Sequence, residues 1–198
     1  MQRAETYLAQ MDNVMAGLIS EHGPCPLATR KVRPFHTLVT SIISQQLSSK
    51  AADTIEDRIA SIVARPFQPD SFLKMPTKKL RSAGLSNAKA EYIIQLAEHV
   101  SKRRLLFKNF ATLDDETVIA SLMELRGIGR WTAEMFLIFG LKRPDVLALS
   151  DAGLQRAARL LYGQGKRNKN LLSKVAEGWR PYRSVASWFL WKYLDATG

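Results

Sequence analysis

Apolar residues recur every three or four positions along nearly the whole chain. This spacing is clear in residues 38–43, 55–63 and 93–100, and it is the period of an amphipathic helix, whereas a half-buried strand alternates every two residues. No stretch alternates convincingly as a strand. Residues 131–139 are apolar on nearly every side, which predicts a central buried helix. The pattern therefore predicts an all-α fold of about ten helices joined by short loops.

Prolines and glycines indicate where some of these helices begin and end. Asp70 and Thr77 each follow a proline and have side chains that can accept a main-chain N–H, so both are predicted N-caps. Gly84 follows a helical segment and is a predicted helix stop. Residues 163–170 are rich in glycine, lysine, arginine and asparagine, which predicts an exposed basic loop.

The charge balance indicates a polyanionic partner. The 198 residues include 29 lysines and arginines against 18 aspartates and glutamates, for a formal net charge of +11. Nucleic acid is favoured over a membrane surface because no basic amphipathic helix stands apart from the predicted fold. Charge alone also fits a basic protein with no such partner. The length allows one domain or two small lobes.

Cysteine content and apolar runs exclude several classes of protein. Cys25 is the single cysteine, so the chain cannot form an internal disulfide or a four-cysteine iron–sulfur or zinc site. His22 and His99 show no metal-ligand spacing with acidic or cysteine partners. The first residues lack a signal-peptide pattern, and no apolar run is long enough to cross a bilayer. We expect a cytoplasmic protein without membrane contact.

The most informative segment is residues 125–133, which read Leu-Arg-Gly-Ile-Gly-Arg-Trp-Thr-Ala. A tight turn at Gly127 and Gly129 between two helices leaves main-chain N–H groups at the start of the second helix, where the helix dipole favours an anion. A DNA phosphate suits that position. Both glycines are predicted to adopt positive φ and to let the phosphate approach. The alternative is an ordinary turn between helices.

An aspartate, Asp151, stands twenty positions after Trp131 in the sequence Leu-Ser-Asp-Ala-Gly-Leu. Its place before a helical segment suits an N-cap. Without the glycine turn, a purely structural capping role would be the favoured interpretation of Asp151. The glycine turn twenty-odd residues earlier favours a catalytic role instead.

Together these features resemble the helix-hairpin-helix DNA glycosylase superfamily, and most closely its 3-methyladenine DNA glycosylase II branch, which acts on alkylated purines. The resemblance covers roughly residues 33–195 and includes three further segments, residues 42–52, 84–93 and 179–191. It implies two helical lobes with a DNA-binding cleft and the hairpin between them. One lobe would comprise residues 1–32 and 145–198, and the other residues 33–144.

The resemblance implies a monofunctional glycosylase of base-excision repair, which flips 3-methyladenine or 7-methylguanine out of DNA and hydrolyses the N-glycosidic bond. Asp151 would stabilise the positive charge that develops on the sugar, or activate water. Trp131 stands where relatives that also cut the DNA backbone carry a lysine that forms a Schiff base. An indole cannot do that chemistry, so no lyase activity is expected.

A base pocket is also implied. Trp131 and Trp191 would present aromatic faces to a cationic purine. Met135 stands where some relatives have a tyrosine and would give a softer wall. Phe35 and His36, at the start of the helix before two glutamines, complete the predicted pocket. The alternative is that the tryptophans lie in the core and that His36 is a surface residue or one with its hydrogen bonds satisfied.

DNA contacts are predicted at two places. By resemblance, the segment Gln45, Gln46, Leu47 and Ser48 enters the minor groove, with Gln46 or Leu47 filling the gap left by the flipped nucleotide. The structural alternative is that Leu47 belongs to the core at the end of a helix and that the two glutamines are solvated.

The second set of predicted DNA contacts lies at the hairpin. Gly127, Gly129 and Thr132 would offer main-chain N–H groups to phosphates, with Arg130 and Lys89 as basic partners. The resemblance allows a structural monovalent cation held by hairpin carbonyls, and no other metal or cofactor is expected. The expected partner is double-stranded DNA with damaged bases, bound by a monomer.

Two other functions remain open from the sequence. The first is a glycosylase for neutral lesions such as uracil, hypoxanthine or ethenoadenine, which needs hydrogen-bonding groups in the pocket; Met135 argues mildly against it. The second is a non-enzymatic helix-hairpin-helix DNA-binding module. It would explain the charge and the hairpin but not the spacing of Asp151 or the paired tryptophans.

Overall fold

The computed structural model describes residues 2–27, 29–163 and 170–197, and these residues form helices and no strand. The all-α prediction is confirmed. The chain divides into two compact units, unit 1 with residues 1–31 and 142–198, and unit 2 with residues 32–141. Most of the predicted basic loop, residues 164–169, lies outside the described residues. No helix in the described part of the chain combines the length and apolarity needed to cross a membrane.

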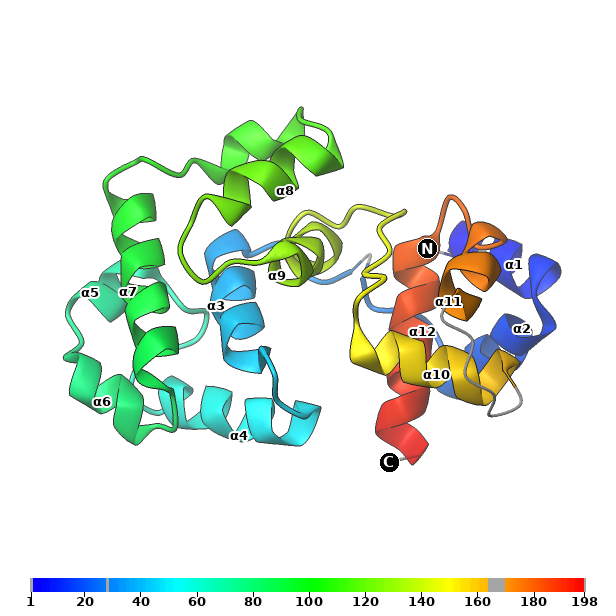
Figure 1. Ribbon diagram of the computed structural model, residues 1–198, viewed down its shortest axis with the longest axis horizontal. Helices are drawn as coiled ribbons and strands as arrows, with labels where there is room; N and C mark the ends of the chain where they lie inside the picture. Colours follow the sequence, from blue (N-terminus) through cyan, green and yellow to red (C-terminus); the bar gives the residue numbers. More distant parts are fainter. Residues whose placement is uncertain (1, 28, 164–169, 198) are drawn as a thin grey trace. The chain divides into compact units, whose positions relative to one another are not determined.

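Unit 2 is built around one central helix. Its elements are α3 (Pro34–Ser44), α4 (Ser49–Ala60), α5 (Pro69–Leu73), α6 (Thr77–Ser82), α7 (Asn87–Ser101), η1 (Phe107–Ala111), α8 (Asp115–Met123), α9 (Arg130–Met135) and η2 (Phe136–Gly140). Helix α3 contacts α4, α7, α9 and η2 (Figure 1). Its apolar positions recur at helical spacing, and Leu38, Val39 and Ile42 are fully buried.

The predicted central helix at residues 131–139 is buried but changes its geometry midway. Residues 132–138 are buried. The α-helical hydrogen bonding of α9 gives way to a π-helical turn, in which the N–H of Leu141 donates to the carbonyl of Phe136 at 2.9 Å. A π-turn accommodates one extra residue within a helix. An apolar pattern indicates burial and cannot reveal this extra residue.

Two predicted N-caps of unit 2 are wrong. Helix α5 begins at Pro69, so Asp70 lies inside its first turn. Proline fits the first helical position because it has no N–H and its φ is already helical. Helix α6 begins at Thr77, with Pro76 in the capping position. The stop at Gly84 is confirmed, since α6 has ended and Gly84 has a φ of +110°.

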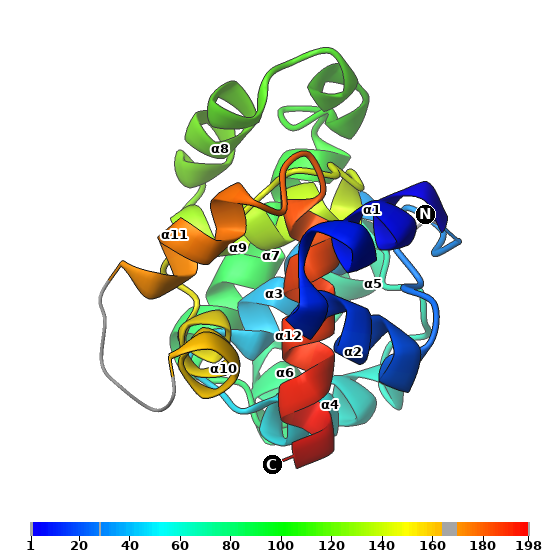
Figure 2. The ribbon, with the colours of Figure 1, turned by 90° about the vertical axis from the view of Figure 1, so that its right-hand side faces the viewer.

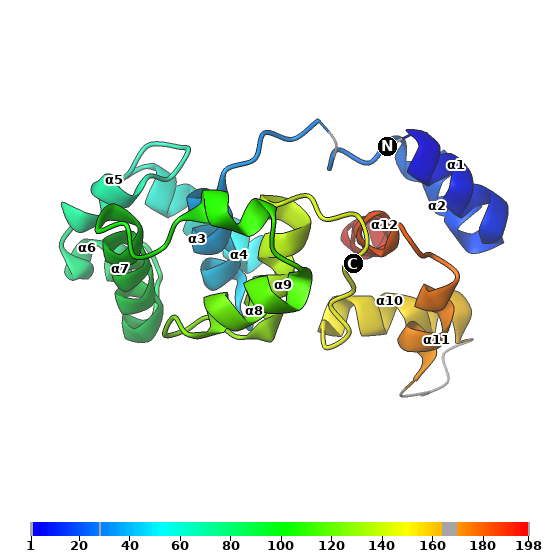
Figure 3. The ribbon, with the colours of Figure 1, turned by 90° about the horizontal axis from the view of Figure 1, so that it is seen from above.

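Unit 1 is assembled from both ends of the chain. It contains α1 (Gln2–Met11), α2 (Asn13–His22), α10 (Ala152–Tyr162), α11 (Leu171–Glu177) and α12 (Arg183–Thr197). Helix α12 contacts α1, α2 and α10, so the last helix of the chain packs against the first two (Figure 2). Helices α1 and α2 lie side by side (Figure 3).

A single carboxylate joins three parts of unit 1. Asp12 caps α2, and its Oδ1 accepts the N–H groups of Val14 and Met15 at 2.9 and 3.1 Å. Its Oδ2 accepts the hydroxyl of Tyr162 at 2.8 Å and the indole N–H of Trp179 at 2.9 Å. Trp179 is fully buried. Because these donors come from α2, α10 and the segment after α11, Asp12 stabilises the packing of all three.

The segment that leads toward Asp151 is fixed to the start of α12. Asp145 accepts hydrogen bonds from the main chain and the guanidinium of Arg183, with a shortest distance of 2.8 Å. Ser184 donates its hydroxyl to the carbonyl of Arg143 at 2.7 Å and accepts the N–H of Val146 at 3.0 Å. These contacts hold residues 143–146 in one conformation and so position the chain before α10.

Candidate functional site

Asp151 is the N-cap of α10. Its backbone is extended, with φ −66° and ψ 120°. Carboxylate Oδ1 accepts the N–H of Leu154 at 2.7 Å and the indole Nε1–H of Trp191 at 3.0 Å. The residue is only 9% exposed. The predicted capping position is therefore confirmed, and the carboxylate is held from two sides.

The surroundings of Asp151 leave little freedom for its side chain. Gly153 lies so close that a Cβ there would stand 3.1 Å from Oδ1 of Asp151 and 3.4 Å from Cδ1 of Trp191. The side chain of Gln155 donates to the carbonyl of Leu149 at 2.8 Å, which fixes the preceding turn. A carboxylate that is oriented before any substrate binds can stabilise positive charge that develops beside it.

Trp191 lies on α12 and is partly exposed. It was predicted as a wall of the base pocket. The structure gives its indole N–H a definite partner, Oδ1 of Asp151. Trp191 therefore orients the candidate catalytic carboxylate.

In unit 2 the hairpin turn depends on Gly127. Its φ is +86°, as predicted, and a Cβ would overlap the ring of Tyr92 at 2.1 Å. Gly129 differs, because its φ is −94° and nothing lies within 4 Å of a Cβ placed there. The prediction of positive φ is thus right for Gly127 and wrong for Gly129. At Gly129 an open approach is the remaining reason for the absence of a side chain.

Helix α9 begins directly after this turn. Its first intrahelical bond joins the N–H of Ala133 to the carbonyl of Gly129 at 3.1 Å. The N–H groups of Arg130 and Thr132 precede that bond, at the positive end of the helix. Of the predicted phosphate-binding amides, that of Thr132 lies in the first turn of α9, and those of Gly127 and Gly129 lie in the turn before it. The N–H of Arg130, whose side chain alone was predicted to contact phosphate, lies beside them.

Arg130 makes contacts that the sequence did not predict. Its guanidinium pairs with Glu116 of α8 and, at 3.1 Å, with Glu134 of α9. The hydrogen bonds to Glu116 raise the pKa of the Arg130 guanidinium. In the structure this side chain thus links α8 to α9, and its predicted phosphate contact stays a prediction.

Lys89 was also predicted as a phosphate partner, and the structure gives it a different contact. Its ammonium donates to the main-chain carbonyls of Ile43 at 2.8 Å and Gln45 at 2.7 Å. Burial lowers the pKa of the Lys89 ammonium. Lys89 therefore joins α7 to the carboxyl end of α3.

The predicted DNA-entering segment forms the turn between α3 and α4. Gln46, Leu47 and Ser48 are exposed, with Leu47 40% exposed, so the alternative of a core leucine is wrong. Ser48 caps α4 by accepting the N–H of Ala51 at 3.3 Å. Gln45 is half-buried, and its side chain reaches the hairpin, where it donates to the carbonyl of Gly127 at 2.8 Å.

The other predicted pocket residues lie in unit 2. Trp131 is partly exposed on α9, and Met135 is 5% exposed. Phe35 is buried, and its ring packs edge-on against that of Phe72, with ring centroids 5.9 Å apart. His36 lies against Phe67, with ring centroids 4.9 Å apart. Phe67 in turn packs against Phe72, so Phe35 and His36 belong to one aromatic cluster of unit 2.

Some residues that shape the site carry only weak sequence signals. Gly153 could have been noticed, because glycine is unfavourable inside a helix and stands two residues after Asp151. No local pattern identifies Tyr92 as the partner of Gly127, or Lys89 as the partner of a helix end, since both contacts join segments far apart in the sequence.

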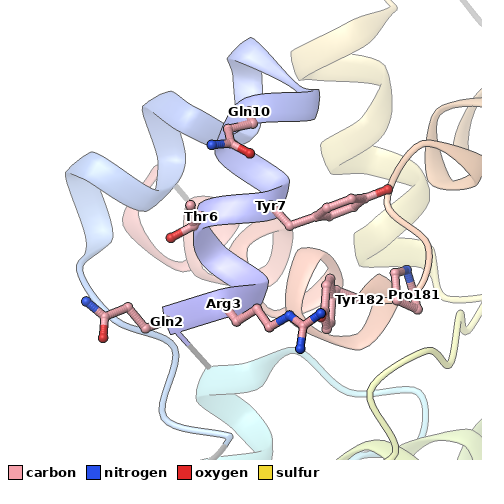
Figure 4. A pocket seen from close by; sticks show the side chains of 7 residues that line it. All are labelled: Gln2, Arg3, Thr6, Tyr7, Gln10, Pro181 and Tyr182. Carbon is pink, nitrogen blue, oxygen red and sulfur yellow. The ribbon is translucent and has the colours of Figure 1, made fainter.

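A surface groove of unit 1 does not involve any predicted site residue. It is lined by Gln2, Arg3, Thr6, Tyr7, Gln10, Pro181 and Tyr182 (Figure 4). Most of its lining residues are exposed. Within the part of the chain that the structure describes, no group of three or more His, Cys, Asp or Glu side chains could hold a metal ion.

Comparisons with known proteins identify the family of this chain. A family model described as "HhH-GPD superfamily base excision DNA repair protein" matches residues 39–181. DNA-3-methyladenine glycosylase 1 of Schizosaccharomyces pombe is 32% identical over 199 residues, covering 97% of this chain and 87% of that protein.

Two solved structures are also similar. The DNA-3-methyladenine glycosidase of Bacillus halodurans is 42% identical, covers 95% of this chain and 87% of its own, and has a TM-score of 0.72. The 3-methyladenine DNA glycosylase of S. pombe (Mag1), in complex with abasic DNA, is 32% identical, covers 96% of this chain and 95% of its own, and has a TM-score of 0.82. These matches, together with the hairpin and the capped aspartate, show that the chain belongs to the HhH-GPD superfamily of base excision DNA repair proteins.

Proposed function

We propose that the chain is a monofunctional DNA glycosylase that removes alkylated purines, 3-methyladenine and 7-methylguanine, from double-stranded DNA. The observation that carries the proposal is the buried carboxylate of Asp151, held by the N–H groups of Leu154 and Trp191. The names of the S. pombe and B. halodurans relatives support the substrate class.

The chemistry follows from what a fixed carboxylate can do. Once the damaged nucleotide is flipped out of the helix, the bond between C1′ of the sugar and the purine nitrogen breaks and the base departs with the bonding electrons. Positive charge then develops on the sugar, and the Asp151 carboxylate stabilises it. The oxygen of a water molecule bonds to C1′, and its proton passes to Asp151 or to solvent. A cationic alkylated purine leaves as a neutral base and needs little other assistance.

Trp131 supports a reaction that ends with an abasic site. An indole nitrogen is not a nucleophile, so Trp131 cannot form the Schiff base that strand cutting requires. Water is then the nucleophile, and the DNA backbone stays intact. The related Mag1 of S. pombe was solved in complex with abasic DNA, which supports the same product.

DNA binding would use the hairpin and the overall charge. The N–H groups of Arg130 and Thr132 at the start of α9 can donate to a phosphate, and a net charge of +11 attracts the duplex. A monomer is sufficient for this role. The monovalent cation stays a prediction; it would depend on hairpin carbonyls, of which that of Gly127 already accepts the Gln45 side chain.

The test is release of free bases from methylated duplex DNA, measured by chromatography for the wild-type chain and for Asp151→Asn. An asparagine Oδ1 can still accept from Leu154 and Trp191, so the variant keeps the cap while it loses the charge. We expect base release to fall roughly 10²- to 10³-fold with DNA binding retained.

Each other result has a clear meaning. Strand cutting by the wild-type chain would overturn the monofunctional assignment. No base released by the wild-type chain would overturn the alkylpurine assignment, and duplexes with uracil, hypoxanthine or ethenoadenine would then be tried. Equal, salt-sensitive binding to damaged and undamaged DNA with no release from any duplex would indicate a DNA-binding module.

A further inference from the structure

The turn between α3 and α4 has an unusual backbone. Gln45 has φ −50° and ψ 125°, Gln46 has φ +57°, and the N–H of Leu47 donates to the carbonyl of Ser44 at 3.1 Å. These are features of a type II turn, in which the position of Gln46 usually holds glycine. A side chain in the left-handed region persists where the surrounding structure imposes it. Something must therefore hold this turn.

The first such contact comes from α7. The ammonium of Lys89 donates to the carbonyls of Ile43 and Gln45 at 2.8 and 2.7 Å. The last carbonyls of a helix have no partner within the helix and carry partial negative charge. Lys89 thus satisfies the end of α3 and fixes the carbonyl immediately before Gln46.

The second contact comes from the hairpin. The side-chain amide of Gln45 donates to the carbonyl of Gly127 at 2.8 Å and to the hydroxyl of Thr132 at 2.9 Å. Thr132 is buried at the start of α9. One residue, Gln45, is therefore bound through its carbonyl by Lys89 and through its side chain by the hairpin. The next two residues in the chain, Gln46 and Leu47, remain exposed.

We propose that Lys89 and Gln45 are positioning residues that hold the exposed tip, Gln46 and Leu47, at a fixed place relative to the hairpin. The inference rests on the proposed function. When the hairpin binds the DNA backbone, the tip is then placed to enter the base stack beside the damaged nucleotide, as apolar wedges do. Lys89 acts through two carbonyls of the protein and makes no phosphate contact.

Three variants separate this role from simple charge loss. Lys89→Met removes the ammonium and keeps the length of the side chain. Gln45→Met removes the amide donors with no change in net charge. Lys50→Met is the matched control, because Lys50 is exposed in the first turn of α4 and its loss removes the same charge as that of Lys89. Thermal unfolding of each variant shows whether it is folded.

Three measurements report the entry of the tip into DNA, the salt dependence of DNA binding and the rate of base release. A duplex with an abasic-site analogue and 2-aminopurine opposite it reports entry of the tip by fluorescence. Titrations at several salt concentrations give the slope of log Kd against log salt. Single-turnover base release at saturating enzyme gives the rate of the bound complex.

We expect Lys89→Met and Gln45→Met to lose most of the fluorescence change and to release base roughly tenfold to a hundredfold more slowly, because a small displacement of a positioned group slows reaction by that much. Their salt slopes should equal that of the wild-type chain. Lys50→Met should keep the wild-type fluorescence change and rate.

Two results would overturn the proposal. The first is a salt slope lowered by about one in Lys89→Met with the fluorescence change retained, which identifies a phosphate contact. The second is wild-type fluorescence and rate in Gln45→Met, which also decides the matter if Lys89→Met does not fold. A wild-type chain that releases no base would overturn the proposed function alone, since fluorescence with the abasic duplex still tests the tip.

Discussion

The indole N–H of Trp191 donates a hydrogen bond of 3.0 Å to Oδ1 of Asp151, an oxygen that also accepts the N–H of Leu154 at 2.7 Å. One donor comes from α12 and the other from the first turn of α10. The carboxylate is thus oriented by two elements of unit 1, and one of its donors, Trp191, lies forty residues after Asp151 in the chain.

Loss of the indole donor should slow the reaction and spare the fold. In Trp191→Phe an aromatic ring remains, but Asp151 loses one hydrogen bond to its charged group, worth about 1.5–3 kcal/mol at most. We expect single-turnover base release to fall roughly tenfold to a hundredfold. Trp188→Phe on the same helix is the matched control and should keep the wild-type rate. Equal rates for Trp191→Phe and wild type would show that the bond does not orient Asp151.

A methyl group beside the carboxylate should slow the reaction with little effect on stability. In Gly153→Ala the new Cβ would stand 3.1 Å from Oδ1 of Asp151, so the carboxylate must move. Alanine favours a helix over glycine by roughly 1 kcal/mol, so urea unfolding should show little loss of stability while base release slows. Gly17→Ala, in α2 with nothing within 4 Å of the new Cβ, should leave the rate unchanged. A Gly153→Ala variant as active as wild type would contradict this account.

Replacing the two hairpin glycines by alanine should affect different properties, stability at Gly127 and DNA affinity at Gly129. Gly127→Ala places a Cβ inside the ring of Tyr92 and strains a φ of +86°, so we expect a loss of about 2–4 kcal/mol in the free energy of unfolding. Gly129→Ala meets no neighbour and should change that free energy by less than about 0.5 kcal/mol. Its DNA affinity should nevertheless fall, because the methyl group obstructs the approach of a phosphate. Urea denaturation and fluorescence anisotropy separate the two effects, and unchanged affinity in Gly129→Ala would argue against a phosphate there.

The carboxylate of Asp12 should contribute more to stability than an exposed helix cap does. Asp12→Ala removes a helix cap and leaves the buried donors of Tyr162 and Trp179 without their acceptor. We expect a loss of about 3–5 kcal/mol in the free energy of unfolding. Asp114→Ala removes an exposed cap of α8 and should lower it by only about 1 kcal/mol. Similar losses in the two variants would mean that the Asp12 contacts are weak.

Cys25 should be unreactive in the folded protein and should make stability depend on pH above neutrality. Burial raises the pKa of its thiol from 9.0 to about 11. The folded state therefore favours the neutral thiol, and this contribution to stability is complete below pH 9 and is lost as the pH rises toward 11. Ellman's reagent at pH 8 should react far more slowly with the native protein than with the unfolded one. Between pH 9 and 11, Cys25→Ala should lose less stability than wild type, and parallel curves would contradict the raised pKa.

Local sequence patterns account for much of the fold. The helical period of apolar residues predicted the all-α structure, and the position of Asp151 before a helical segment predicted its N-cap. Both depend on interactions within a few residues, which the sequence displays directly. The start of α5 was misplaced by two residues, because the capping signal of Asp70 outweighed the fit of Pro69 to the first helical position.

Contacts between distant segments could not be predicted in the same way. Lys89 was interpreted as a DNA contact because a lysine in a segment that resembles the family carries no sign of its partner. Its ammonium binds the end of α3, more than forty positions earlier. The two hairpin glycines look alike in sequence, yet only Gly127 has positive φ and lies against the ring of Tyr92, a residue far away in the sequence.

The hydrogen bonds between Arg183 and Asp145 also affect which sequence changes this chain can tolerate during evolution. The chain enters unit 1 at Lys142, and within four residues the first turn of α12 binds Arg143, Asp145 and Val146. A shift introduced by an insertion or substitution before Lys142 is therefore stopped before it reaches Asp151. Under the proposed function, residues of unit 2 would therefore be able to change during evolution while the Asp151 carboxylate keeps its geometry within unit 1.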